Sequence, residues 1–119
     1  MSVRRRWRFY TTRAGRNPVR EFLDSDRVPV GDRDEILAAM KDVQVNGLDV
    51  ARHLQVDLYE VRADGRSATY RVLFAAEGAR SQVLLGLSAF SKKTQKTPPR
   101  EIALADRRLR DWRSRSASR

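Results

Sequence analysis

The alternation of hydrophobic and polar residues changes along the chain and indicates where strands give way to helices. Near the N-terminus, Trp7 and Phe9 alternate with Arg6 and Arg8. A period of two is typical of a strand that buries one of its faces. The turn-forming residues at 14–18 end this pattern, so we predict a first strand that stops before them.

Two helices are predicted between this break and residue 47. The first is capped by Asn17, begins at Pro18 and extends to about Ser25. The second begins at Asp32 and ends near Gly47. The apolar residues at helical spacing are Val19, Phe22, Leu23, Ile36, Leu37, Met40 and Val43. The acidic residues of the second helix are interpreted as a solvated face: Asp32, Asp34, Glu35 and Asp42.

The second half of the chain predicts three strands and a last helix. The strands fall at about residues 58–62, 69–74 and 82–87, joined by turns that favour hairpins, so we expect an antiparallel meander. The last helix begins at Pro98, and residues 113–119 are predicted to form a basic flexible tail. Residues 1–119 therefore read as a single domain of the α+β class, with its helices packed on one antiparallel sheet.

Composition restricts the classes of function. The chain of 119 residues has no cysteine, which rules out disulfides and thiolate chemistry. No apolar stretch is long enough to span a bilayer, and no secretory signal follows the N-terminal arginines, so we expect a cytoplasmic protein without membrane contact. His53 is the only histidine and lacks neighbours with ligand spacing, so neither a metal nor another cofactor is expected.

The positive charge is unevenly distributed. The net charge is +10, with an excess of base in residues 1–20 and 61–119 and an excess of acid in residues 21–60. This asymmetry favours a polyanionic partner, although a codon bias toward arginine would also raise the charge. Such a bias does not explain three of the four lysines falling at Lys92, Lys93 and Lys96.

Arg62 and Arg71 are the candidates for chemistry on the sheet. A hairpin between them can place both guanidinium groups on one face, where they could neutralise the transition state of RNA cleavage by the 2′-hydroxyl. The alternative is that both are exposed strand residues paired with Glu60 or Asp57. Glu60 or a lysine of lowered pKa could serve as the general base, but Glu60 is equally placed to pair with Arg62.

Three segments together resemble one known family. They are Gly15–Leu23 (GRNPVREFL), Leu58–Arg62 followed by Tyr70–Phe74 (LYEVR and YRVLF), and Phe90–Ile102 (FSKKTQKTPPREI). Their order and spacing are similar to those of the RelE/ParE toxin superfamily of type II toxin–antitoxin systems, in its HigB-like, phage-derived branch. The resemblance covers residues 7–112, and the last segment is its most specific part.

The resemblance implies a RelE-like fold and an endoribonuclease that cleaves messenger RNA on the ribosome without a metal, which inhibits translation. The catalytic residues it implies are Arg62, Arg71, Lys93 and Glu60, the last standing where some members have a basic residue. The RNA-contacting residues it implies are Lys92, Gln95, Lys96 and Arg100. The last helix lacks the tyrosine found in well-studied members.

The resemblance also implies partners. The expected partners are a cognate helix-turn-helix antitoxin, messenger RNA with the ribosomal RNA around it, and operator DNA reached only through the antitoxin. Two alternatives stay open at this point. One is a gyrase inhibitor of the ParE type, and the other is a non-catalytic module that binds RNA or ribosomes.

Overall fold

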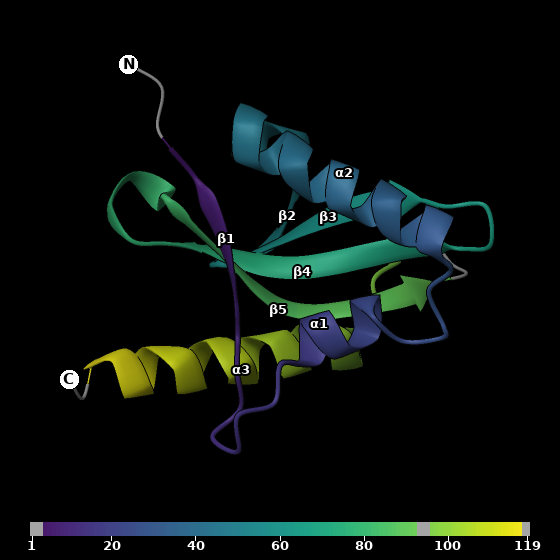
Figure 1. Ribbon diagram of the computed structural model, residues 1–119. Helices are drawn as coiled ribbons and strands as arrows, with labels where there is room; N and C mark the ends of the chain where they lie inside the picture. The colour runs from purple at the N-terminus through teal and green to yellow at the C-terminus, as the bar shows by residue number, and fades with distance from the viewer. Residues whose placement is uncertain (1–3, 93–95, 118–119) are drawn as a thin grey trace.

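The computed structural model describes residues 4–92 and 96–117 of the chain. Within these ranges, five strands form one sheet in the order β1-β5-β4-β3-β2 (Figure 1). The elements, in chain order, are β1 (Arg6–Phe9), α1 (Pro18–Leu23), α2 (Val30–Asn46), η1 (Leu48–Val50), β2 (Arg52–Gln55), β3 (Leu58–Asp64), β4 (Thr69–Glu77), η2 (Ala79–Ser81), β5 (Val83–Lys92) and α3 (Pro99–Ala117).

The predicted meander is confirmed, but the sheet around it is larger and mixed. Strands β3, β4 and β5 pair antiparallel in sequence order. Strand β1 adds to the far side of β5 in parallel, with Arg6 beside Val83 and Phe9 beside Gly86. Strand β2, which was not predicted, pairs antiparallel with β3. The prediction of a purely antiparallel sheet is therefore wrong.

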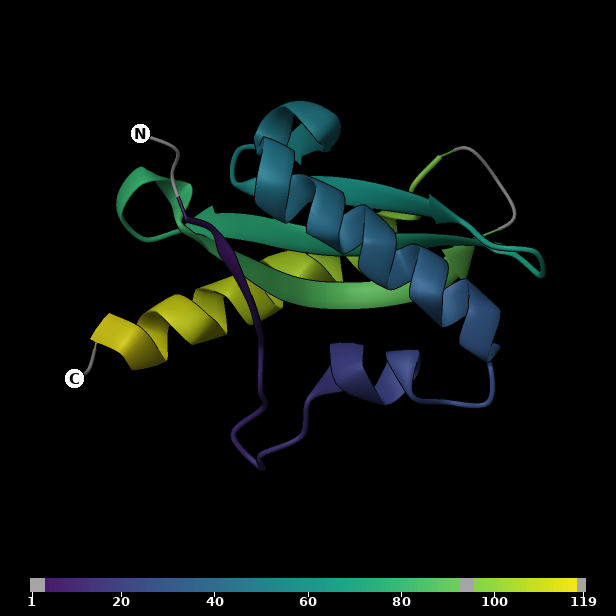
Figure 2. The same cartoon turned by 45° about the horizontal axis from the view of Figure 1, so that its top comes forward.

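The helices cover both faces of the sheet. Figure 2 shows α2 lying across the sheet on the side opposite α3. One buried cluster joins α1 and α2 to the sheet: Val19, Phe22, Leu23, Val28, Ile36, Met40, Val43, Val61, Ala63, Tyr70, Val72, Phe74 and Leu84. A second joins α3 to the other face: Tyr10, Leu58, Leu73, Ala75, Leu85, Leu87, Ala105 and Leu109. Because successive side chains of a strand point to opposite faces, β3, β4 and β5 each contribute residues to both clusters, one on each face of the sheet.

The predicted cap of α1 and the predicted end of α2 agree with the structure, whereas the predicted start of α2 does not. Asn17 Oδ1 accepts a hydrogen bond from the Arg20 amide at 3.1 Å, and this confirms the cap of α1. Gly47 ends α2 with φ of 87°, a conformation that glycine adopts readily. However, α2 begins at Val30, two residues before the predicted start, and Leu37, predicted to be apolar core, is 46% exposed.

Asp32 differs most from the expected solvated face. It is buried, and its carboxylate accepts hydrogen bonds from the Tyr70 hydroxyl at 2.7 Å and from the Arg66 and Ser67 amides at 2.8 and 3.1 Å. The turn between β3 and β4 wraps over this carboxylate, and a Cβ on Gly65 would lie 2.7 Å from Asp32 Oδ1. Asp32 therefore fastens α2 to the hairpin that carries Arg62 and Arg71.

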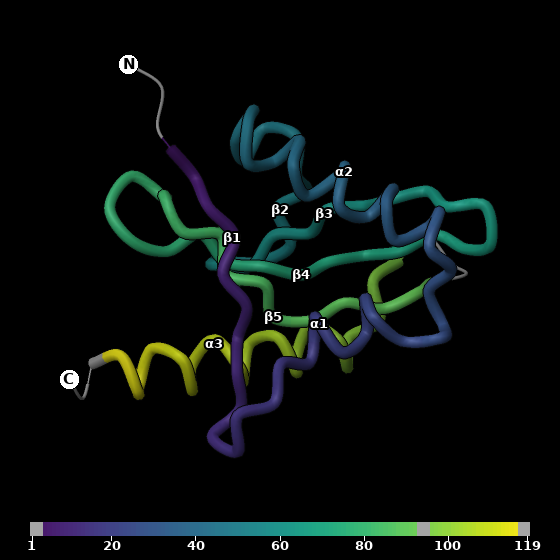
Figure 3. Tube along the Cα trace, viewed as in Figure 1, coloured from purple at the N-terminus to yellow at the C-terminus, as the bar shows by residue number. Residues whose placement is uncertain are grey.

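Helix α3 continues to Ala117, so residues 113–117 are helical and not the flexible tail that was predicted. Arg113 explains part of this order, because it forms ion pairs with Glu77 at 2.9 Å and with Asp57 at 3.1 Å. Tyr10 donates a hydrogen bond to Asp111 at 2.6 Å. Figure 3 follows the segment after β1 past α3 before it turns back into α1.

Candidate active site

The face of the sheet next to the start of α3 carries a cluster of charged side chains. Arg62 and Arg71 are directly opposite each other on β3 and β4, which confirms that they share a face. Glu60 lies two residues before Arg62 and therefore points to the same side. Lys92 ends β5 and is opposite Thr69, two residues before Arg71. Strand pairing thus brings side chains from three strands together.

Glu60 and Arg71 form a buried ion pair at the centre of this cluster. Arg71 Nη1 lies 3.0 Å from Glu60 Oε1, and their side chains are 6% and 1% exposed. The Thr97 hydroxyl donates a hydrogen bond to Glu60 Oε2. Both oxygens of the carboxylate are therefore engaged, one by β4 and the other by the segment that leads into α3. Sequence reasoning missed this contact.

Arg62 has a different environment from Arg71. Its side chain is exposed, and its Nε donates to Asp64 Oδ1 at 3.0 Å. An exposed pair of this kind contributes little to stability, about 0–1 kcal/mol. Arg62 is thus the member of the arginine pair that an incoming phosphate can reach. Of the two arginines that the sequence left as possible partners of Glu60, the structure pairs Arg71 with it, while Arg62 pairs with Asp64.

Lys92 is buried at the end of β5, although it was expected to contact phosphate at the surface. Its residue is 7% exposed, and Nζ has no hydrogen-bond partner among the described residues. Burial lowers the pKa of the Lys92 amine, and the charges of Arg71, Arg52 and Arg62 lower it further, while Glu60 opposes them. The pKa of the Lys92 amine is therefore lowered by its burial and by three nearby guanidinium groups.

Arg52 joins the cluster from β2, where it is opposite Glu60. It was not predicted, because residues 52–55 show no clear alternation that would mark a strand. Among the other expected residues, Lys93 and Gln95 lie outside the described ranges. Lys96 is exposed, and Arg100 is exposed in the first turn of α3, where it lines a neighbouring cavity.

The cluster suits an anionic substrate. Arginine presents fixed, planar donors that match phosphate oxygens at any working pH. A buried amine with a lowered pKa is a proton acceptor that becomes available closer to neutral pH than an ordinary lysine. Tyr59 and Tyr70, which could have stacked on bases, instead pack in the core on the opposite face, as predicted. The chemistry on this face is therefore carried by charge.

Residues 23–110 match the family described as phage derived protein Gp49-like (DUF891). The chain belongs to this Gp49-like family. The match covers more than half of the chain and includes the whole charged cluster, from Arg52 to Thr97. No curated protein matches the sequence.

The Gp49-like family is a family of RelE-like toxins associated with toxin–antitoxin systems. The mixed sheet with a C-terminal helix is compatible with a RelE-like fold. Membership suggests an antitoxin as a partner. In the part of the chain that the structure describes, no helix combines the length and the apolar composition that crossing a membrane requires.

Proposed function

We propose that the protein is the toxin of a type II toxin–antitoxin system and acts as a ribosome-dependent messenger RNA endonuclease of the HigB-like kind. One observation carries the proposal: Arg52, Arg62, Arg71 and Lys92 come from four strands to one face of the sheet, beside the carboxylates of Glu60 and Asp64. Membership of the Gp49-like family supports the toxin role.

The proposed reaction uses the nucleophile that RNA itself supplies. The 2′-oxygen attacks the adjacent phosphorus, and the bond from phosphorus to the 5′-oxygen of the next nucleotide breaks. The products are a 2′,3′-cyclic phosphate and a 5′-hydroxyl, whose oxygen takes its proton from solvent. Negative charge builds up on the phosphate oxygens in the transition state, and preorganised donors stabilise it. Arg62, which is exposed, contacts these oxygens, and Arg71 adds its charge from below.

Lys92 is the proposed general base. Its neutral amine accepts the proton of the 2′-hydroxyl and becomes an ammonium group, which adds a positive charge as the phosphate gains a negative one. Burial and the neighbouring arginines lower its pKa, so the neutral form is populated at a lower pH than for an exposed lysine.

Glu60, expected to be catalytic, is proposed to act as a positioning residue. Its two oxygens are held by Arg71 and Thr97, so neither is available to accept the substrate proton. It fixes the Arg71 guanidinium and links it to the segment before α3. Of the remaining residues that the resemblance implies, Lys93 is proposed as a catalytic residue, and Gln95, Lys96 and Arg100 are proposed as RNA contacts.

The proposed partners follow from this role. Messenger RNA is presented in the ribosomal A site, and ribosomal RNA meets the basic surface of the protein in the cytoplasm. A helix-turn-helix antitoxin neutralises the toxin and brings it to operator DNA.

Inducible expression in a bacterial host tests this function, with 5′-end mapping of transcripts in the presence and absence of the neighbouring gene product. We expect growth arrest with new 5′ ends inside codons. Arg62→Ala should abolish both effects, and Arg66→Ala, which removes an exposed arginine from the same hairpin, should not. DNA damage with intact transcripts would contradict the proposal and favour a gyrase inhibitor. Ribosome binding without new ends would favour a non-catalytic module.

A further inference from the structure

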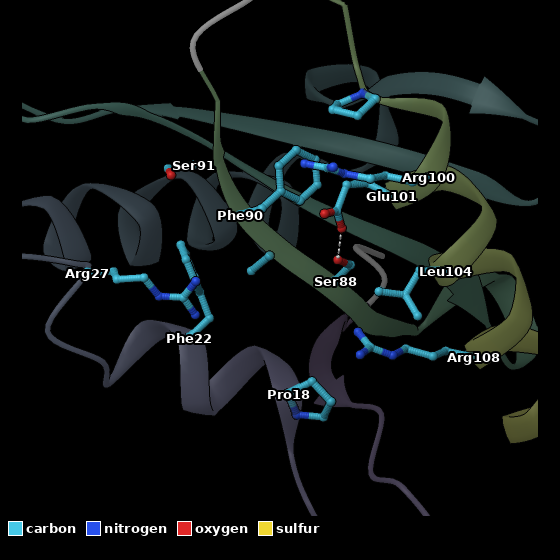
Figure 4. Close-up of a pocket in the computed structure, with 12 residues that line it drawn as sticks. Pro18, Phe22, Arg27, Ser88, Phe90, Ser91, Arg100, Glu101, Leu104 and Arg108 are labelled. Atoms are coloured by element: carbon cyan, nitrogen blue, oxygen red, sulfur yellow. Dashed lines mark hydrogen bonds between the residues drawn. The ribbon is translucent and has the colours of Figure 1, made fainter.

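A cavity of about 380 Å³ lies beside the charged cluster, between α1, β5 and α3. Figure 4 shows Phe22 and Arg27 on one side of β5, and Arg100, Glu101 and Arg108 on the side of α3. Strand β1 pairs with β5 only from Val83 to Gly86. Beyond that point, the described part of the sheet adds no strand to this edge of β5, so the cavity opens onto the strand itself.

The lining of the cavity is strongly basic. Arg27 lies between α1 and α2, Arg100 and Arg108 both lie on α3, and Glu101 is the one carboxylate among the lining residues. Glu101 is already engaged, because its Oε1 accepts a hydrogen bond from Ser88 at 2.9 Å. Arg108 donates to the Leu87 carbonyl at 2.7 Å. Among the described residues, Arg27 and Arg100 form no ion pair, so their guanidinium groups can accept an outside anion.

The cavity also offers an aromatic surface. Phe90 is half-buried and lines the cavity, and Phe22 lies beneath the Arg27 guanidinium with 5.1 Å between Cζ and the ring centre. Aromatic rings of this kind provide stacking surfaces for unpaired bases. The cavity thus combines arginines that can bind a phosphate with a ring on which an unpaired base can stack, which are the two groups that recognise a single-stranded nucleotide.

The position of the cavity ties it to the charged cluster. Phe90 on β5 is the cross-strand partner of Arg71 on β4, and neighbouring strands lie about 4.8 Å apart. Pro98, which lines the cavity, directly follows Thr97, which holds Glu60. A strand of RNA with its scissile phosphate at Arg62 and Arg71 can therefore place an adjacent nucleotide over β5.

We propose that this cavity is a second RNA subsite, which binds the nucleotide next to the cleaved phosphate. Arg27 and Arg100 donate to its phosphate oxygens, and its base packs against Phe90. The inference rests on the proposed function for the identity of the strand. A cavity of this volume, flanked by two helices, is at the small end of ligand pockets, about 300–1,000 Å³, which suits one nucleotide better than an extended peptide.

The test compares two double variants with equal charge. Arg27→Ala with Arg100→Ala removes the arginines of the cavity. Arg20→Ala with Arg107→Ala removes two exposed arginines of the same helical regions that do not line it. The probes are 2′-O-methyl triadenylate, which cannot be cleaved by 2′-hydroxyl attack, and 3′-adenosine monophosphate. Binding is measured by calorimetry at low salt, and cleavage is measured on programmed ribosomes.

We expect the wild type and the control to bind the trinucleotide at least about tenfold more tightly than the mononucleotide. The variant with Arg27→Ala and Arg100→Ala should bind the trinucleotide no more tightly than the mononucleotide, and its affinity for the mononucleotide should equal that of the wild type. An equal loss in both variants would overturn the subsite, because charge alone would then explain the binding. A cavity variant that weakens only antitoxin binding would also overturn it and would show a protein-docking surface.

The same experiment separates the subsite from the nuclease. If the wild type cleaves messages and the cavity variant behaves like its control, the subsite is wrong and the nuclease stands. If the trinucleotide gain depends on Arg27 and Arg100 in a protein that cleaves no message, the subsite stands and the nuclease is wrong.

Discussion

Glu60 and Arg71 are joined across neighbouring strands by an ion pair that solvent hardly reaches, with 3.0 Å between Oε1 and Nη1. Removing one partner of such a pair costs more than the pair contributes, because the other charge stays buried. This changes how the arginines must be tested. Replacing Arg62 and Arg71 together would disturb folding as well as chemistry, so Arg62 is the better probe of function.

Glu60→Gln is expected to lower the free energy of unfolding by about 3–5 kcal/mol, because it leaves the buried Arg71 charge facing a neutral amide. Urea unfolding measures the change. Asp64→Asn is the matched control, since it removes the carboxylate that pairs with exposed Arg62, and it should cost about 0–1 kcal/mol. Equal losses of unfolding free energy in the two variants would show that the buried ion pair contributes no more to stability than the exposed one.

Gly65→Ala should destabilise the protein by about 1–3 kcal/mol, because the added methyl group would displace the Asp32 carboxylate from its buried hydrogen bonds. Gly31→Ala is the control, since its Cβ would meet no atom within 4 Å and it lies within α2. There the substitution should stabilise by about 0.5–1 kcal/mol. Thermal melts of both variants report the sign, and a stabilising Gly65→Ala would refute the packing described for the turn.

The Tyr70–Asp32 contact predicts a pH dependence of stability. The hydrogen bond from Tyr70 lowers the pKa of Asp32, so its contribution is present above the unfolded value of about 3.9 and is lost as pH falls through the folded pKa. Burial and Asp32 raise the pKa of Tyr70 to about 12, so its contribution is present below about pH 10 and is lost as pH rises through 12.

Tyr70→Phe removes this hydrogen bond and tests the predicted loss of stability at both low and high pH. The difference in unfolding free energy between wild type and variant should be constant at mid pH and shrink at both extremes. Tyr59→Phe, a change to a half-buried tyrosine on the same face, is the control. A Tyr70→Phe difference that does not change below pH 4 would contradict the assignment.

The proposed role of Lys92 predicts the pH dependence of cleavage. The rate should rise with pH and level off below the ordinary lysine range, because burial and the charges of Arg71, Arg52 and Arg62 lower the pKa of the amine. Lys92→Arg keeps a positive charge but cannot accept the proton, so we expect a loss of about 10²–10⁴-fold.

Lys41→Arg is the matched control for Lys92→Arg, because Lys41 is exposed on α2, and its profile should match the wild type. Single-turnover cleavage on programmed ribosomes measures each profile. If Lys92→Arg retains the rate and the rising limb, the proton acceptor is another group.

The parts of the fold that were predictable have a local signature. Strand β3 alternates apolar and polar residues, β4 and β5 contain short apolar runs, and turns separate the three strands, so their antiparallel pairing follows from the sequence. Strand β1 shows the same alternation, but its partner is more than seventy residues away, and no local pattern gives that pairing or its direction. Strand β2 is short, mostly exposed and lacks alternation, so it was missed.

The sequence predicted which residues form much of the candidate site, but it did not predict how deeply they are buried or which contacts they make. Strand register placed Arg62 and Arg71 on one face, but it did not give their unequal burial, because register does not say which elements pack over each residue. The contacts of Thr97 with Glu60 and of Tyr70 with Asp32 join residues 37 and 38 positions apart. Contacts at such separation arise from tertiary packing and leave no periodic trace in the sequence.

The most direct test is cleavage of a defined messenger RNA by purified protein on programmed ribosomes, with chemical analysis of the ends. We predict cuts within the A-site codon that leave 5′-hydroxyl ends, with Arg62→Ala inactive and Arg66→Ala active. An intact message in the presence of folded wild-type protein, or equal cleavage by the Arg62→Ala variant, would contradict the account.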